Sequence, residues 1–291
     1  DSSGESRRHP ECPLDWLLAF KALLLGIVEG LTEFLPVSST GHLIVIEDIV
    51  GFRIPTREAF IVAIQGGAIL AVCWEYRRRL AQFVRHLLRD AREQRLAVNV
   101  AVGFLPAALV GVLAKSSIER YLFKPVPVAA ALVVGALVIL WAEARHKRRY
   151  GELDLAGTRH ARVETLDDIR PWDALRVGLA QCLALIPGTS RSGATIIGGL
   201  LLGLSRKAAT EFSFFLAIPT VIGASVYSGY KAREQFVAAD LPLYAIGFVA
   251  AFFAALACVR WFLHFVGSHD FRPFAWYRIV FGGVILLTAW A

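Results

Sequence analysis

Two short stretches of this sequence carry residue types that could perform phosphate chemistry. Residues 29–42 contain two carboxylates, Glu29 and Glu33, followed by a proline, three hydroxyl residues and a histidine. Residues 187–193 contain a second proline, further hydroxyl residues and one arginine, Arg191. Both stretches lie inside long apolar runs. Ionisable residues are costly in such a setting, so they are functional by default.

The two carboxylates are four residues apart, so on a helix they share one face, with Cβ atoms about 5–6 Å apart. Two anions this close in a low dielectric either share a proton or are neutralised by a cation. A divalent cation, Mg²⁺ or Ca²⁺, prefers carboxylate oxygens and bridges them to a substrate phosphate. A salt bridge to Arg191 is the alternative, and it is compatible with catalysis. We therefore predict Glu29 and Glu33 as metal ligands and catalytic residues.

The hydroxyl residues after each proline predict the start of a new helix. The first N–H groups of a helix are unpaired and form an anion site. The guanidinium of Arg191 matches phosphate oxygens with its planar fork. For Ser38 and Thr189, helix capping is the simpler interpretation. The predicted phosphate-binding residues are Ser38, Thr40, Gly41, Thr189, Ser190, Arg191, Ser192 and Gly193.

Ser39 and His42 complete the predicted catalytic set of Glu29, Glu33, Ser39, His42 and Arg191. A buried histidine taken alone is more often a core residue. Because two glutamates and a hydroxyl residue lie in the same stretch, an acid/base role for His42 is favoured more strongly. Ser39 is the candidate nucleophile, assisted by His42 or Glu33, and attack by an activated water is the alternative. Together these residues predict a site that hydrolyses a phosphate or a diphosphate.

The elements that hold these residues are predicted to be membrane helices. Hydrophobic residues make up 56% of the 291 residues and charged residues only 19%, which is unlike a soluble domain. Apolar runs of about 17–25 residues recur, the length needed to cross a bilayer. The sequence therefore predicts an all-α polytopic membrane protein, and it contains no nucleic-acid-binding motif. The predicted spans are residues 60–76, 98–113, 126–143, 212–230, 243–263 and 274–290.

Two longer apolar segments, residues 14–50 and 172–204, are interrupted by Pro36 and Pro187. Proline removes a backbone donor and disrupts a helix, so we predict two re-entrant helical hairpins. The segments also resemble each other, because Gly26, Glu29, Leu31, Pro36, Ser39 and Gly41 align with Gly178, Gln181, Leu183, Pro187, Ser190 and Gly193.

Each hairpin precedes three spans, an odd number, so the second copy is predicted to be inverted, with the two breaks facing each other. The predicted organisation is one integral membrane domain. It consists of a polar tail (1–13), a first repeat (14–146), a basic cytoplasmic loop (147–170) and a second repeat (171–291). The connections after residues 76 and 143 are rich in arginine, and the positive-inside rule therefore predicts that they are cytoplasmic. The site would then face the outer side.

Residues 29–42 and 187–195 resemble the two signature motifs of the bacterial undecaprenyl-diphosphate phosphatase family, also called the bacitracin-resistance protein; residues 211–219 resemble it too. The resemblance implies removal of the terminal phosphate of undecaprenyl diphosphate at the outer face of the bacterial plasma membrane. This reaction recycles the lipid carrier for peptidoglycan synthesis. The resemblance also implies a divalent metal at Glu29 and Glu33, a nucleophile or acid/base at Ser39 or His42, and a diphosphate grip by Arg191.

A transporter or lipid flippase is the alternative function, since inverted repeats and paired hairpins are equally typical of transporters. The expected partners are a polyprenyl diphosphate and membrane lipids, with no nucleic acid, and the sequence is compatible with a homodimer.

Overall fold

The computed structural model describes residues 15–122, 124–151, 161–231, 233 and 237–290. Within these ranges the regular elements are helices, apart from an isolated β-bridge between Val163 and Leu204. The predicted all-α fold is confirmed for this part of the chain. The predicted tail and residues 152–160 of the predicted loop lie outside it. The α-helices are α1 (Trp16–Thr32), α2 (Ser39–Val50), α3 (Arg57–Glu75), α4 (Arg77–His86), α5 (Ala91–Leu122), α6 (Pro125–Tyr150), α7 (Pro171–Gln181), α8 (Arg191–Leu201), α9 (Arg206–Lys231), α10 (Leu241–Phe265) and α11 (Arg272–Trp290).

Five helical segments among the described residues are long and apolar enough to cross a membrane. They comprise α3, residues 91–114 of α5, α6, α9 and residues 238–265, which include α10. They match five of the six predicted spans and indicate a multi-pass membrane protein. The sixth predicted span forms α11, which contains the fully buried Arg278 and is not among the five. Its crossing of the membrane stays a prediction.

Both interrupted segments fold as a helix, a break and a second helix that turns back. In the first, α1 and α2 flank residues 33–38, and Lys21 Nζ donates to the Gly51 carbonyl (3.1 Å), which ties the two outer ends together. In the second, α7 is followed by the 3₁₀ helix Cys182–Leu185, a break and then α8. Arg162 ties its ends, because its guanidinium binds both Asp173 (2.6 Å) and the Leu202 carbonyl (3.0 Å).

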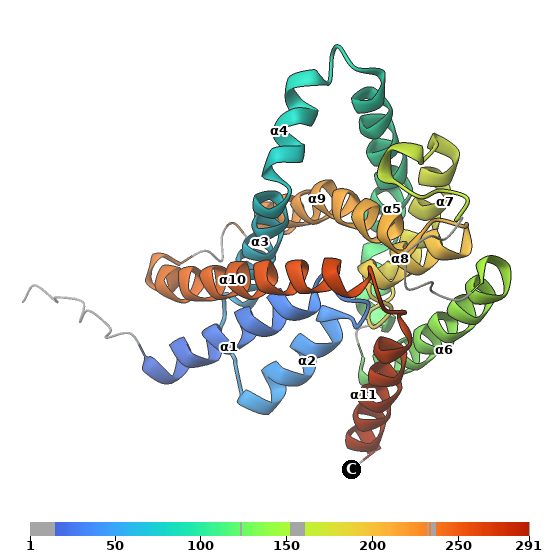
Figure 1. Ribbon diagram of the computed structural model, residues 1–291. Coiled ribbons are helices and arrows are strands. Elements are labelled where there is room, and N and C mark those ends of the chain that lie inside the picture. The colour runs from blue at the N-terminus through green and yellow to red at the C-terminus, as the bar shows by residue number, and fades with distance from the viewer. Residues whose placement is uncertain (1–14, 123, 152–160, 232, 234–236, 291) are drawn as a thin grey trace, which may run out of the picture.

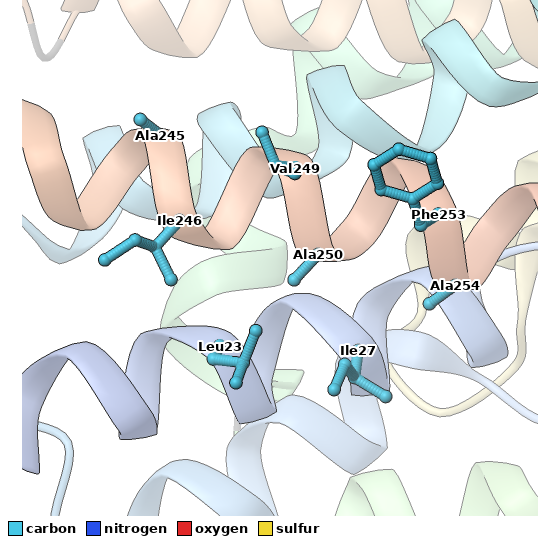
Figure 2. Close-up of a pocket in the computed structure, with 8 residues that line it drawn as sticks. All are labelled: Leu23, Ile27, Ala245, Ile246, Val249, Ala250, Phe253 and Ala254. Carbon is cyan, nitrogen blue, oxygen red and sulfur yellow. The ribbon is translucent and has the colours of Figure 1, made fainter.

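Glycines let the first helix of each hairpin approach a long helix closely. A Cβ on Gly26 of α1 would overlap the backbone of α10 at Gly247, and a Cβ on Gly178 of α7 would overlap the backbone of α5 at Gly103. In Figure 1, α1 accordingly runs alongside α10. Figure 2 shows the groove between them, which is lined by Leu23, Ile27, Ala245, Ile246, Val249, Ala250, Phe253 and Ala254. The residues that line this groove are all apolar.

The largest hydrophobic cluster joins the two predicted repeats. It contains Phe34 of the first break, Phe212 and Phe214 of α9, and Ala275 of α11, all fully or almost fully buried. Phe34 meets Phe214 edge-on, with ring centroids 5.5 Å apart. The two halves therefore share one core, to which the first break contributes Phe34 and Val37. In Figure 1, α4 and the start of α5 project upward, while Leu80 and Phe83 of α4 pack against the cluster and Leu96 of α5 belongs to it.

Candidate active site

The two breaks lie against each other, as the sequence predicted. Ser192 of α8 donates its hydroxyl to the Leu35 carbonyl of the first break (2.6 Å), and Ser190 donates to the same oxygen at 3.4 Å. Arg191 reaches across to Glu33, with an Nη2–Oε1 distance of 3.4 Å. Residues more than 150 positions apart in the chain thus form one polar cluster inside an apolar core.

Each break ends in a serine with a left-handed backbone. Ser38 has φ of 73° and Ser190 has φ of 74°, values that non-glycine residues rarely adopt and that cost about 1–3 kcal/mol. Each serine caps the helix that follows: Ser38 Oγ accepts from the N–H of Gly41 (3.4 Å), and Ser190 Oγ accepts from the N–H of Gly193 (3.1 Å). Two strained turns therefore start the two helices in the same way.

These caps correct two details of the sequence analysis. Ser190 corresponds to Ser38 rather than to Ser39, so Ser39 and Arg191 hold equivalent positions as the first residues of α2 and α8. Ser38 is a cap, as predicted, whereas Thr189 is not, because the capping side chain belongs to Ser190. The hydroxyls of Ser190 and Ser192 contact the Leu35 carbonyl of the first break, and their binding of substrate stays a prediction.

Ser39 and Arg191, the first residues of α2 and α8, both contact the carboxylate of Glu33. Ser39 donates its hydroxyl to Oε2 at 2.6 Å, and Arg191 lies 3.4 Å from Oε1. The side chains of Glu33 and Arg191 are each only 11% exposed, so the pair is screened from water. A carboxylate hydrogen-bonded to a hydroxyl can accept its proton, and the adjacent guanidinium can stabilise negative charge on a phosphate. The predicted counter-anion of the buried arginine is therefore Glu33.

Glu29 lies one helical turn before Glu33 and is completely buried. Neither of its carboxylate oxygens has a hydrogen-bond partner among the described residues. An uncompensated buried carboxylate is strongly unfavourable, so this group requires a proton or a cation. The described residues contain no cluster of three or more His, Cys, Asp or Glu side chains that could hold a metal. Two carboxylates still fit Mg²⁺, which usually keeps several waters and binds one or two carboxylates plus substrate phosphate.

Arg191 is held in place by three contacts, one with α9 and two with the first break. Its Nη1 donates to the Ser213 carbonyl of α9 at 3.0 Å, its Nη2 faces Glu33, and its guanidinium lies 5.9 Å from the Phe34 ring centroid. Ser213 belongs to the 211–219 stretch singled out in the sequence. These contacts fix the orientation of the Arg191 guanidinium in the site.

His42 lies near the first break, but it does not hydrogen-bond to Ser39. Its Nδ1 is 2.7 Å from the Ser38 carbonyl oxygen, and its Nε2 is 2.6 Å from the hydroxyl of Tyr277. The hydroxyl of Ser39 bonds to Glu33 instead. Of the two bases that the sequence offered for Ser39, the geometry favours Glu33. Thr40 is half-buried at the start of α2 beside them.

Arg278 of α11 is the residue that sequence reasoning missed. It is 1% exposed and directs its N–H groups at five backbone carbonyls. Two belong to α6, one to the first break and two to the second break: Leu132 (3.1 Å), Ala131 (3.2 Å), Pro36 (3.1 Å), Thr189 (3.0 Å) and Gly188 (3.0 Å). The sequence did contain a signal for Arg278, because an arginine inside a predicted span needs partners. The same signal identified Arg191.

A groove of about 1030 Å³ adjoins the breaks. It includes Gly41 in the first turn of α2 and Val128 of α6, against whose carbonyl Gly188 of the second break packs. Its walls are mostly apolar, and its charged members are Glu47 and Asp48 of α2 together with Arg53 and Arg57. These charged side chains pair with one another, Arg57 with Glu47 (2.6 Å) and Arg53 with Asp48 (3.6 Å).

Comparison with known proteins agrees with this picture. Residues 22–284 match the family described as bacitracin resistance protein BacA. An undecaprenyl-diphosphatase of Methylibium petroleiphilum is 56% identical over 277 residues, covering 95% of this chain and 97% of the relative. Undecaprenyl-diphosphatases of Ralstonia nicotianae and Pseudomonas fluorescens are also 56% identical and cover 95% and 94% of this chain. With its paired breaks inside a helical membrane body, the chain belongs to the bacitracin resistance protein BacA family.

Proposed function

We propose that this protein is an integral membrane undecaprenyl-diphosphatase. It hydrolyses undecaprenyl diphosphate to undecaprenyl phosphate and phosphate, which recycles the carrier lipid for peptidoglycan synthesis and underlies bacitracin resistance. The relatives that carry this name align over nearly the whole chain. The observation that carries the proposal is the convergence of Ser39 and Arg191 on Glu33, at the start of two helices that face each other. This arrangement combines a nucleophile, a base and an anion clamp.

In the proposed reaction, Arg191 and the N–H groups at the starts of α2 and α8 hold the diphosphate oxygens. Ser39 Oγ attacks the terminal phosphorus and transfers its proton to Glu33, while the bond from that phosphorus to the bridging oxygen breaks. Undecaprenyl phosphate leaves, and water then hydrolyses the phosphoserine. In the alternative route, Glu33 deprotonates a water that attacks the same phosphorus directly. Preorganised positive groups lower the barrier in either route.

Glu29 and Glu33 are the residues that would hold a divalent cation, Mg²⁺ or Ca²⁺. Glu29 would hold it through the oxygens that lack a hydrogen-bond partner, and Glu33 would contribute beside it. When bound, such a cation would supply Lewis-acid stabilisation of charge on the phosphoryl oxygens. The cation would also neutralise the buried carboxylate of Glu29.

The architecture that we propose is a pair of inverted repeats with re-entrant hairpins. Its support is that corresponding helices pack in corresponding ways. In the first hairpin α1 packs against α10, and in the second hairpin α7 packs against α5. The last helices of the two repeats, α6 and α11, pack against each other. The aligned glycines Gly26 and Gly178 make these two close approaches. The two strained serine caps are likewise equivalent. A homodimer remains a prediction.

We propose that the site opens to the outer side of the bacterial plasma membrane. Support comes from the arginine-rich ends of α4 and α6, which the positive-inside rule assigns to the cytoplasm. The groove at Gly41 then lies toward the outer leaflet and offers apolar walls to the prenyl chain.

The test is phosphate release from a prenyl diphosphate by the purified protein in detergent. We expect release that depends on a divalent cation and that falls at least about 100-fold in Glu33→Gln, since general base catalysis contributes roughly 10²–10⁴-fold. Trp276→Phe, a change at an exposed residue of α11, serves as the control with unchanged activity. No release at any cation concentration would refute the phosphatase and favour a transporter or flippase, which needs a substrate pocket but no base.

A further inference from the structure

The ring of His42 is held by three groups, none of which is a reacting group. Nδ1 lies 2.7 Å from the Ser38 carbonyl oxygen, and Nε2 lies 2.6 Å from the hydroxyl of Tyr277. Phe281 stacks on the ring, with centroids 4.2 Å apart and planes 14° from parallel. With an exposure of 6%, His42 has little freedom to turn toward another partner.

These contacts determine where the imidazole proton lies. A backbone carbonyl only accepts hydrogen bonds, so Nδ1 must carry the proton. In the neutral ring Nε2 is then an acceptor, and the hydroxyl of Tyr277 is its donor. The Ser38 carbonyl therefore selects the tautomer, and Tyr277 holds the ring in the orientation in which Nδ1 binds that carbonyl.

The carbonyl that His42 holds belongs to the strained cap residue. Ser38 has φ of 73°, and its carbonyl also accepts the backbone N–H of His42 at 3.3 Å. Two bonds from one residue thus fix the turn that immediately precedes Ser39. The hydroxyl of Ser39 lies 2.6 Å from Glu33, a separation that depends on this turn.

We propose that Tyr277 is a positioning residue that acts through His42. By donating to Nε2 it holds the imidazole ring where the protonated Nδ1 binds the Ser38 carbonyl, which keeps Ser39 aligned with Glu33. His42 takes no part in proton transfer. The inference rests on the proposed phosphatase activity, except for the position of the proton, which can be measured without it.

Two substitutions of His42 separate positioning from acid/base chemistry. The side-chain amide of Asn places an N–H close to the position of Nδ1, whereas the amide of Gln reaches the position of Nε2. If His42 only holds Ser38, His42→Asn keeps kcat within about ten-fold of the parent and His42→Gln loses about 100-fold, because small misplacements of reacting groups cost that much. Equal losses of about 100-fold or more in both variants would overturn the proposal, and so would full activity in both.

Tyr277→Phe tests the other end of the contact and preserves the ring stack. We expect kcat to fall about five-fold, the loss typical of one hydrogen bond, with KM within about two-fold. The matched control is Tyr230→Phe, which removes the hydroxyl from a 70% exposed tyrosine on α9 and leaves kcat unchanged. An unchanged kcat in Tyr277→Phe, or a fall equal to that in the control, would refute the role of Tyr277.

Nitrogen NMR of ¹⁵N-histidine-labelled protein in detergent provides a measurement that needs no activity. The His42 signals, identified by their loss in His42→Asn, should show a protonated Nδ1 and an unprotonated Nε2 that shifts in Tyr277→Phe. A proton on Nε2 would overturn the inference. If wild-type protein released no phosphate but showed this tautomer, the proposed function would fail while the assigned hydrogen bonds stood.

Discussion

Replacing Gly135 with alanine should disable the contact that joins the two breaks without removing a charge. Gly135 lies on α6 beside Arg278, and an added Cβ would overlap the guanidinium at Nη2. This nitrogen donates to the carbonyls of Ala131 (3.2 Å) and Gly188 (3.0 Å). Two hydrogen bonds from a charged group contribute about 3–6 kcal/mol, and overpacking alone typically costs about 1–3 kcal/mol. We expect Gly135→Ala to lower the free energy of unfolding by about 3 kcal/mol.

The assay compares Gly135→Ala with Gly283→Ala, an identical change on α11 where the new Cβ meets nothing within 4 Å. A loss of about 3 kcal/mol lowers the midpoint of thermal unfolding in detergent by roughly 6–12 °C. The control should be equal to wild type or gain about 0.5–1 kcal/mol, because alanine is favoured over glycine in a helix. Phosphate release should fall about 10–100-fold in Gly135→Ala, since the shifted guanidinium no longer fixes the second break. If both variants unfolded at the same temperature and were equally active, Arg278 would not hold the breaks together.

Further predictions concern the reacting groups and their setting. Ser39→Ala should lose at least about 100-fold in kcat if Ser39 is the nucleophile, and loss of less than about ten-fold would leave only the water route. Arg191→Lys, which keeps the charge but not the planar fork, should lower kcat/KM by about 100-fold in phosphate-release assays, and wild-type kinetics would contradict the clamp. EDTA should abolish activity and Mg²⁺ restore it, while Glu29→Gln should need a higher Mg²⁺ concentration for half-maximal rate; metal-independent turnover would exclude the cation site. A cysteine at the exposed position of Arg53 should react with a membrane-impermeant thiol reagent added outside intact cells, and labelling only after lysis would reverse the proposed orientation.

The sequence predicted the helices and the breaks because both follow from local chemistry. An apolar run has the length of a membrane, and proline interrupts a helix wherever it stands. Five predicted spans and both interrupted hairpins accordingly agree with the structure. The alignment of the breaks was off by one residue, because two adjacent serines are indistinguishable until one of them shows φ of 73°. The backbone angle identifies Ser38 as the cap, and Ser39 is the serine that we propose to react.

The role of α11 could not be predicted, because it depends on contacts between distant segments. Arg278 binds the Pro36 carbonyl from 242 residues away, and Tyr277 binds His42 from 235 residues away. No local periodicity predicts such an approach. The position of Arg278 within an apolar run still marked it as needing partners, but backbone carbonyls, unlike a carboxylate, leave no signature in the sequence.

The equivalence of the two breaks explains why neither could form a site alone. Each supplies the same strained serine and the same helix start, but the first residue of α2 is Ser39, whereas that of α8 is Arg191. The first break has the hydroxyl and the carboxylates but no cation of its own. The second has the guanidinium, while Gln181 stands where the aligned first segment has Glu29. Because one position cannot hold both the proposed nucleophile and the proposed clamp, the proposed chemistry requires two turns of the same shape with different residues, both in contact with Glu33.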